Sequence, residues 1–319
     1  MTETATITTS VFIDGAVGTT GIEIRDRLAG RPELSLISLA EAERKNLDAR
    51  RTALNDADVV ILCLPDDAAR EAVSLIANDR TKVIDASTAH RVAPGWAYGF
   101  PELEPDQAER IAASRRIANP GCYPTGYLAL VRPLVRAGIV PADWPLTVNA
   151  VSGYSGGGKS MVAEFEDRAA PTAFRAYGLP LAHKHVPEMQ AHGGTHHPPV
   201  FAPAVANVYR GMLVEVPLQL AAMPGAPSLA AVHETLSAAY DESALVRVAS
   251  MADASAMAGL TIEQVGTTDR LDLFVFGNAA TGQARLVAAL DNLGKGAAGA
   301  AVQNLNILAG LPQTAGLRL

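Results

Sequence analysis

The sequence has little cysteine and no apolar segment long enough to cross a bilayer. Cys63 and Cys122 are the only two Cys among 319 residues. They are too few for a disulfide framework or a cysteine-rich zinc site, and such low usage is typical of a reducing compartment. No apolar run approaches the roughly 20 residues that a membrane-spanning helix needs. Residues 1–6 are polar and carry an acid where a signal peptide would be positively charged. These absences predict a cytoplasmic protein without a membrane partner.

A long basic run is also missing. The chain has 26 basic and 33 acidic residues, a net charge of −7, which argues against a nucleic-acid partner on electrostatic grounds. The composition that is present, 49% apolar residues with 27 Gly and 20 Pro, is that of an ordinary globular enzyme. At roughly 150 residues per domain, the length indicates about two domains.

The first third of the chain alternates short apolar runs with helix-like segments. Short apolar runs at 11–13, 59–64 and 83–86 are typical of parallel strands covered on both faces, and 34–39 is expected to be a further strand. Asp66 and Asp67 are expected to cap a helix that reaches about Asn78. This βαβαβ pattern predicts a doubly wound, Rossmann-type α/β sheet.

The pattern changes near residue 118. Longer strand-like segments follow at 146–151, 212–216, 271–276 and 284–290 with few helices between them, which indicates a mixed sheet of the α+β class. The Ala-rich tail has apolar residues at helical spacing and could pack back on the first domain. We therefore expect a Rossmann-type cofactor domain at 1–117 and 295–319, and a mixed-sheet catalytic and oligomerisation domain at 118–294.

A glycine-rich turn follows the first strand and opens the first helix. Its spacing is G-x-x-G-x-x-G, one glycine displaced from the usual dinucleotide fingerprint. Glycines there let the backbone approach a pyrophosphate, which the helix N-terminus stabilises. The alternative is a tight strand–helix turn that binds nothing. The cofactor-binding residues expected here are Gly15, Gly18, Thr19, Thr20 and Gly21.

The tip of the second strand indicates which cofactor binds. NAD-binding domains carry an acid there for the ribose hydroxyl, whereas this chain has Ser38, with Arg44 and Lys45 soon after. A hydroxyl and cations fit a 2′-phosphate, so we expect NADP with contacts from Ser38 and Arg44. Glu41 and Glu43 oppose this interpretation, and the two cations could instead be solvated surface charges.

Cys122 lies between two prolines in Asn-Pro-Gly-Cys-Tyr-Pro-Thr-Gly, residues 119–126. Pro124 fits the first turn of a helix, where its missing N–H costs nothing. Cys122 would then lie at a helix N-terminus, where the dipole favours the thiolate and nucleophilic attack. The alternative is a small buried apolar side chain. Cys63, inside a strand, is expected to be an inert core thiol.

These motifs together resemble a known family. The segment 119–125, the glycine turn and His-Lys-His-Val-Pro-Glu at 183–188 resemble the short form of the N-acetyl-γ-glutamyl-phosphate reductases, in the aspartate-semialdehyde dehydrogenase superfamily. Segments 64–67, 98–102 and 291–297 are similar too, so the resemblance spans essentially the whole chain. It implies an arginine-biosynthesis enzyme that is a homo-oligomer, a dimer or tetramer.

The resemblance implies a reaction and its residues. Cys122 would displace phosphate from the acyl phosphate to form a thioester, which NADPH reduces to the semialdehyde; the reverse reaction uses inorganic phosphate. His183 or His185 would be the acid–base, and we favour His185. Further cofactor contacts are expected at Leu64, Pro65, Ser87, Ser155, Gly156, Gly157 and Asn292. Substrate contacts are expected at Arg91, Asn119, Lys159 and Lys184.

Other functions remain open at this stage. Residues 153–160 fit the P-loop pattern G-x-x-x-x-G-K-[ST], with 286–291 as an acidic partner strand, and would suit an NTP-dependent enzyme. The glycine turn at 15–21 and the absence of βα units after 160 oppose it. The same chemistry on aspartyl phosphate or a carrier-linked aminoadipyl phosphate is a nearer alternative, and an NADP-binding sensor with a redox-active Cys122 is a third. Five of the seven His lie between 183 and 197, but no zinc-site pattern accompanies them, so no metal is expected.

Overall fold

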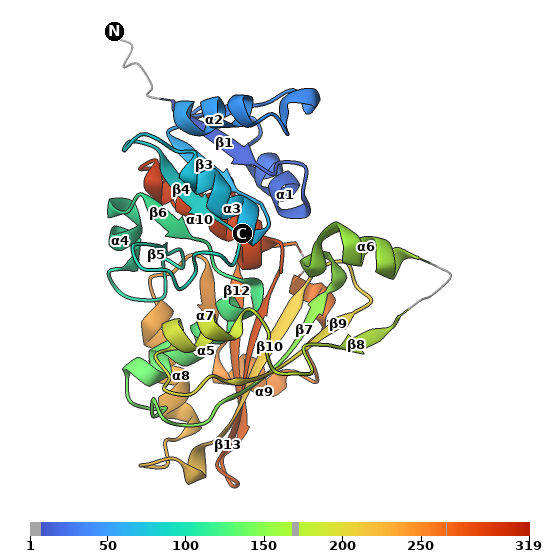
Figure 1. Cartoon of the computed structure of the whole chain (residues 1–319). Helices are drawn as coiled ribbons and strands as arrows, with labels where there is room; N and C mark the ends of the chain where they lie inside the picture. The colour runs from blue at the N-terminus through green and yellow to red at the C-terminus, as the bar shows by residue number, and fades with distance from the viewer. Residues whose placement is uncertain (1–7, 168–171, 266) are drawn as a thin grey trace. The chain divides into compact units, whose positions relative to one another are not determined.

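The computed structural model describes residues 8–167, 172–265 and 267–319, so the polar segment 1–6 lies outside the described residues. The chain forms two compact units. The first comprises 1–101, 106–120 and 298–317, and the second 102–105, 121–297 and 318–319. Figure 1 colours both by position along the chain.

The first unit contains a six-stranded, all-parallel sheet in the order β2-β1-β3-β4-β6-β5. Because the order reverses between β1 and β3, a crevice opens there beyond the strands' carboxyl ends, where doubly wound sheets bind their ligands. The strands are β1 Thr9–Asp14, β2 Leu34–Ile37, β3 Val59–Leu62, β4 Lys82–Asp85, β5 Ala97–Tyr98 and β6 Arg116–Ala118.

Both faces of this sheet are buried. Val11 and Ile61 face a cluster with α1 (Thr19–Leu28), α4 (Gln107–Ala113) and α10 (Gly299–Leu308), while Phe12 and Val60 face α2 (Leu47–Asp56) and α3 (Asp66–Ser74). Neighbouring residues of one strand thus enter opposite cores, which explains the unalternating apolar runs. The tail helix α10 packs on β3 and β4 of this sheet.

Helix α3 differs from the sequence prediction at both ends. Its N-cap is Pro65 and no side chain caps it; Asp66 instead accepts hydrogen bonds from the Thr88 backbone N–H (2.9 Å) and Oγ1 (2.6 Å). The helix ends at Ser74 rather than near Asn78. Asn78 is not helical because its Oδ1 accepts from the backbone N–H groups of Arg80 (3.0 Å) and Thr81 (2.8 Å).

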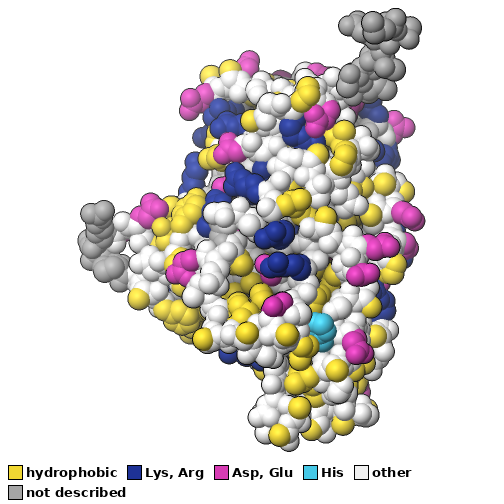
Figure 2. Space-filling view, turned by 180° about the vertical axis from the view of Figure 1, so that it is seen from behind, with side chains coloured by type: hydrophobic (Ala, Val, Ile, Leu, Met, Phe, Trp, Pro, Cys, Tyr) yellow, Lys and Arg dark blue, Asp and Glu magenta, His cyan; other side chains and the backbone are white. Residues whose placement is uncertain are grey.

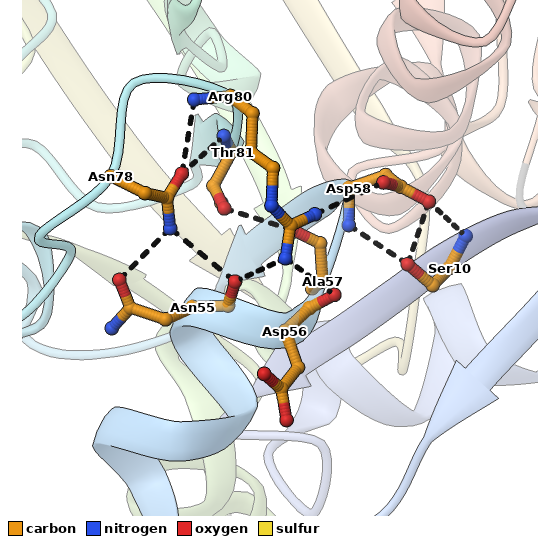
Figure 3. Close-up of polar contacts among 8 residues, drawn as sticks. All are labelled: Ser10, Asn55, Asp56, Ala57, Asp58, Asn78, Arg80 and Thr81. Atoms are coloured by element: carbon orange, nitrogen blue, oxygen red, sulfur yellow. Dashed lines mark hydrogen bonds and ion pairs between the residues drawn. The ribbon is translucent and has the colours of Figure 1, made fainter.

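A polar network closes the amino-terminal edge of this sheet (Figure 3). The Asp58 carboxylate accepts from the Ser10 backbone N–H (2.9 Å) and Oγ (2.7 Å) and pairs with Arg80 at 3.3 Å. Arg80 also donates to the carbonyl oxygens of Asn55 (2.6 Å) and Asp56 (3.2 Å). These contacts tie β1, α2 and the segment before β4 together at the edge away from the ligand crevice.

The second unit is built on a seven-stranded mixed sheet in the order β11-β12-β13-β10-β7-β9-β8. The β7–β9 and β11–β12 pairs are parallel and the remaining pairs antiparallel. The strands are β7 Thr147–Gly153, β8 Phe174–Ala176, β9 Val200–Ala206, β10 Met212–Gln219, β11 Val246–Val248, β12 Leu271–Asn278 and β13 Gln283–Leu290. The helices are α5 Cys122–Arg136, α6 Gly158–Glu166, α7 Val186–Gly193, α8 Leu229–Tyr240 and α9 Met251–Ala256.

The two faces of the mixed sheet differ. Helix α5 packs on β10 and β13, between α7 and α8, and covers one face. On the other face Leu213 and Phe276 are only partly buried, and the stacked rings of Phe274 and Phe276 lie 5.9 Å apart. These features confirm the predicted fold class, a doubly wound parallel sheet followed by a mixed-sheet α+β unit.

Basic and acidic side chains are interspersed on the face drawn in Figure 2, with hydrophobic side chains between them. Among the described residues, no helix is both long and apolar enough to span a membrane. Within the same residues, no three metal-ligating side chains gather into a site.

Candidate active site

Cys122 is the first residue of α5, and Gly121 is the N-cap. Pro124 lies in the first turn, as the sequence predicts. The Gly121 backbone N–H donates to the buried Glu188 carboxylate at 2.8 Å, which ties the start of α5 to α7. A helix N-terminus stabilises negative charge, so this location favours a thiolate at Cys122.

Aromatic and imidazole rings gather beside this helix start. The Tyr123 ring lies 6.2 Å from His183 and 5.9 Å from His185 between centroids, and the two imidazoles are 4.8 Å apart. Phe201 packs at 5.1 Å against both Tyr123 and His183. The fold therefore brings both predicted histidines to the residue next to the cysteine.

Two tyrosine hydroxyls also belong to this cluster. Tyr177 Oη donates to Tyr123 Oη at 3.1 Å, and Tyr123 Oη donates to the Ala204 carbonyl at 3.1 Å. The pKa of Tyr177 is raised to about 12, mainly by burial; the hydrogen bond with Tyr123 and the charge of Arg175 oppose this rise, and the charge of Cys122 adds to it. Tyr177 thus remains protonated near a thiolate. Sequence reasoning missed it because it lies 55 residues from Cys122 and carries no motif.

The two histidines have different surroundings. Burial, followed by the charge of Lys184, lowers the pKa of His183 to about 4. Its Nδ1 accepts a hydrogen bond from the His185 backbone N–H at 3.2 Å. His183 is therefore neutral at pH 7 and orients its neighbour, whereas His185 is buried at the start of α7.

In the first unit, the glycine turn joins β1 to α1 as predicted. Gly15 has φ +89°, and a Cβ built there would lie 2.3 Å from the Cys63 carbonyl oxygen. Only glycine fits so close an approach. Gly18 is the N-cap of α1 and has no side-chain cap, so the helix N-terminus is available to a phosphate.

A cavity of about 1100 Å³ lies along this turn. It is lined by Gly15, Ser38, Arg44 and Leu64, all predicted cofactor contacts, and also by Lys45. Arg25 and Arg50 add further positive charge, although Arg50 is paired with Asp14 at 2.9 Å. A glycine cradle beside several cations fits a dinucleotide that carries an extra phosphate.

Several other residues that the sequence predicts to contact cofactor or substrate form hydrogen bonds within the first unit. Ser87 donates to the buried Asp85 carboxylate at 2.7 Å. Arg91 is buried, and its guanidinium donates to the carbonyls of Asn119 (3.0 Å) and Ala86 (3.1 Å). Asn119 is itself buried and accepts from Asn304 at 3.1 Å. Arg91 and Asn119 therefore fix the segment that leads to the cysteine, and their substrate contacts stay predictions.

The P-loop-like segment does form a strand–turn–helix, β7, the 3₁₀ turn Tyr154–Gly157 and α6. Its strand, however, pairs antiparallel with β10, and β10 separates it from β13, the supposed acidic partner. Asp291, after β13, pairs with Arg210 at 3.1 Å. This is not the all-parallel core of a P-loop enzyme.

Hydrogen bonds to Asn292, in the same unit, hold the loop before α6 in place. Asn292 donates to Ser155 Oγ (2.9 Å) and accepts from the Gly211 backbone N–H (2.9 Å), so both ends of its amide are used. Gly156 and Gly157 are exposed, as are Lys159 and Lys184. Asn292 thus positions the loop, while the glycines and lysines are accessible to ligands.

Comparison with known proteins places this site in a family. Residues 10–111 match the NAD binding domain of semialdehyde dehydrogenases, and residues 122–292 match their dimerisation domain. The N-acetyl-gamma-glutamyl-phosphate reductases of Brucella anthropi and Brucella ovis are each 54% identical over 305 residues, which are 94% of this chain and 98% of theirs.

Solved structures agree on the fold. Aspartate semialdehyde dehydrogenase II from Vibrio cholerae has a TM-score of 0.70 at 17% identity, over 95% of this chain and 99% of that one. The Candida albicans aspartate semialdehyde dehydrogenase solved with NADP has a TM-score of 0.64 at 16% identity, over 95% and 99%. Two matching domains and relatives at 54% identity show that the chain belongs to the semialdehyde dehydrogenase family of NAD(P)-dependent oxidoreductases.

Proposed function

We propose that this chain reduces N-acetyl-γ-glutamyl phosphate to N-acetylglutamate 5-semialdehyde and inorganic phosphate, reversibly, with Cys122 as nucleophile. The observation that carries the proposal is a cysteine at the N-terminus of α5 beside an imidazole pair. The curated reductases at 54% identity support the choice of substrate.

The first step forms a covalent intermediate. The Cys122 thiolate attacks the acyl carbon, the bond from that carbon to the phosphate oxygen breaks, and inorganic phosphate leaves with its electron pair. A thioester results, which accepts hydride far more readily than a carboxylate. The N-terminus of α5 stabilises the thiolate before attack and again after product release.

Proton movement is assigned to His185. The tetrahedral adduct on Cys122 needs a proton donor for its oxygen during reduction, and that proton leaves again when the C–S bond breaks. His183 is a poor donor because its pKa is about 4. We assign it the role of orienting His185 through the hydrogen bond from the His185 backbone N–H to its Nδ1.

We propose that residues 1–117 and 295–319, which include most of the first unit, form the NADP domain, and that residues 118–294 form the catalytic and oligomerisation domain. When bound, NADPH supplies the hydride that reduces the thioester. Ser38 and Arg44 would hold its 2′-phosphate, and the start of α1 its pyrophosphate. The remaining predicted cofactor contacts are Thr19, Thr20, Gly21, Pro65, Ser155, Gly156 and Gly157.

The assembly is proposed to be a dimer or tetramer in the cytoplasm. The partly covered sheet face around Leu213 and Phe276 offers an apolar surface, and the family's second domain is described as a dimerisation domain. Arginine biosynthesis from small soluble intermediates fits a cytoplasmic location.

The test runs the reaction backwards. Purified protein is mixed with N-acetylglutamate semialdehyde, phosphate and NADP, and absorbance of the reduced cofactor is followed. Cys122→Ser should lower kcat by about 10⁴-fold or more, the order expected when a covalent nucleophile is removed. Cys63→Ser is the matched control, since burial raises the pKa of the Cys63 thiol to about 12; it should retain activity. An active Cys122→Ser enzyme would refute the mechanism.

Substrate choice is tested separately. Aspartate semialdehyde is supplied in place of the N-acetylated substrate, and the two values of kcat/KM are compared. We expect a preference of at least about 100-fold for the N-acetylated substrate, because a site that hydrogen-bonds a polar substrate group discriminates strongly against a substrate that lacks it. Equal values would favour the aspartyl alternative and leave the role of Cys122 intact.

A further inference from the structure

A turn of π-helix, Gly294–Ala298, lies directly behind Cys122. Such turns are rare and occur frequently at functional sites. The turn begins from a fixed point, because the carbonyl oxygen of buried Asp291 accepts from the backbone N–H groups of both Gly294 and Gly296 at 3.0 Å.

Gly296 is the residue of this turn that touches the cysteine. A Cβ built on Gly296 would lie 2.9 Å from the Cys122 Cβ and 3.3 Å from its Cα. Real Cβ atoms essentially never come this close to another atom, so the backbone of the turn packs directly against the base of the nucleophile.

Lys295, the residue before Gly296, has a side chain that is only 1% exposed and contacts Glu102. Its Nζ donates to both Glu102 carboxylate oxygens, at 2.9 and 2.8 Å. Removing two charges from water costs several kcal/mol per ion, and well-packed apolar residues are often at least as stabilising. A gain in stability therefore does not explain why this buried pair is present. Its ability to fix the position of the π turn does.

We propose that Lys295 and Glu102 are positioning residues for the chemistry at Cys122. Their ion pair holds the π turn in one place, so that Gly296 lies against the Cys122 Cβ and restricts the directions the thiol can take. Neither side chain needs to touch the substrate. The inference rests on the proposed role of Cys122, and it adds a second requirement, a fixed support behind the sulfur.

The test removes both charges together. Lys295→Met/Glu102→Leu leaves no unpaired buried carboxylate and should keep its thermal midpoint close to that of the wild type. We expect kcat to fall about 10- to 100-fold, as displacement of a reacting group by about 1 Å does, with KM within about threefold. The rate at which iodoacetamide alkylates Cys122, followed by mass spectrometry, should also differ from that of the wild type. This measurement does not depend on catalytic activity.

Gly296→Ala supplies a second variant should the double variant not fold. Its methyl group would displace Cys122, and the same loss of kcat and altered alkylation are expected. Arg136→Met is the matched control. It removes one ion pair to the neighbouring Glu104 (2.8 Å) at the other end of α5, roughly 20 Å from Cys122 along the helix, and should leave kcat unchanged.

The outcomes separate the two proposals. Wild-type kcat and alkylation rate in the folded double variant, or in Gly296→Ala, would overturn the positioning role. If Cys122→Ser instead keeps wild-type activity, the proposed role of Cys122 as nucleophile fails, and the alkylation rates still report whether the turn orients the thiol.

Discussion

His183 and His185 are two residues apart, yet they are expected to affect catalysis differently. His185→Gln should lower kcat by about 10²–10⁴-fold, the usual contribution of a general acid–base. His183→Gln keeps a hydrogen-bond acceptor and should cost less than about tenfold. Both are measured as kcat/KM against pH, and a larger loss in His183→Gln would reverse the assignment.

Burial of His183 also predicts a pH dependence of stability. Its pKa falls from 6.5 to about 4 on folding, so below pH 6.5 the unfolded chain binds a proton that the folded chain does not. Stability should therefore decline as pH falls from about 6.5 towards 4. Thermal midpoints of His183→Gln should decline less over that range, and an unchanged slope would contradict the lowered pKa.

Ser38 is the side chain on which cofactor choice is expected to depend. Ser38→Asp places a carboxylate in the cavity among the cations Arg44 and Lys45, where it repels a 2′-phosphate and can accept from a free ribose hydroxyl. The ratio of kcat/KM for NADP over NAD should fall about tenfold or more, equivalent to about 1.4 kcal/mol. Ser35→Asp, at an exposed position of β2 three residues before Ser38, is the control. An unchanged ratio would place phosphate recognition elsewhere.

Much of the site was readable from single residues, and the exceptions have physical reasons. Glycine spacing, Cys122 and the His-x-His pair are local patterns, and the fold places them where such patterns predict. The Arg91 guanidinium donates to the backbone carbonyls of Asn119 and Ala86, a role that no local pattern indicates, and its substrate contact stays a prediction. Tyr177 and Gly296 approach Cys122 only through tertiary packing, which no local pattern records.

At the scale of elements, the network in Figure 3 predicts an acid-sensitive edge of the parallel sheet. Burial raises the pKa of Asp58, but hydrogen bonds from Ser10 and the charge of Arg80 outweigh it and lower the pKa overall. A carboxyl with a lowered pKa stabilises the fold above its unfolded pKa, and this stabilisation is lost as pH falls through the folded value.

Asp58→Asn should therefore destabilise the protein at pH 7 by about 1 kcal/mol, the scale of one hydrogen-bonded contact. The difference should shrink towards pH 3, where the carboxyl becomes protonated. Urea denaturation at both pH values measures it. Asp56→Asn is the control, since that exposed carboxylate makes none of the contacts drawn in Figure 3; an equal effect in both variants would mean that only net charge matters.

Element boundaries show where sequence reasoning stops. The strands of the first sheet were predictable because both faces are buried, so apolar residues mark their full length. Helix α3 ended early because Asn78 turns the backbone through its own side chain, and Asp66 bonds to Thr88 across the unit rather than to its own helix. A polar side chain such as Asp66 or Asn78 can bond to its own helix or to other backbone groups, and the tertiary structure decides which of these bonds forms.

At the scale of the whole molecule, the partly covered face of the mixed sheet around Leu213 and Phe276 predicts self-association. Phe276 lines a cavity of about 300 Å³ on that face, together with Leu213 and Val287. Phe276→Arg would place a charge in an apolar contact and should convert the oligomer to monomers, as measured by analytical ultracentrifugation. Val92→Arg, at an exposed site in the first unit, is the control. An oligomer that survives Phe276→Arg would place the interface elsewhere.

Helix α10 makes the first unit depend on a segment that is synthesised long after the strands it covers. Ala301, Val302 and Leu305 of this helix are fully buried against Val11 and Ile84, strand residues made more than 200 positions earlier. Until α10 has been synthesised, only α1 and α4 can cover this face of the sheet. A chain truncated before α10 would therefore leave part of the apolar face, including the surroundings of Val11 and Ile84, exposed to solvent.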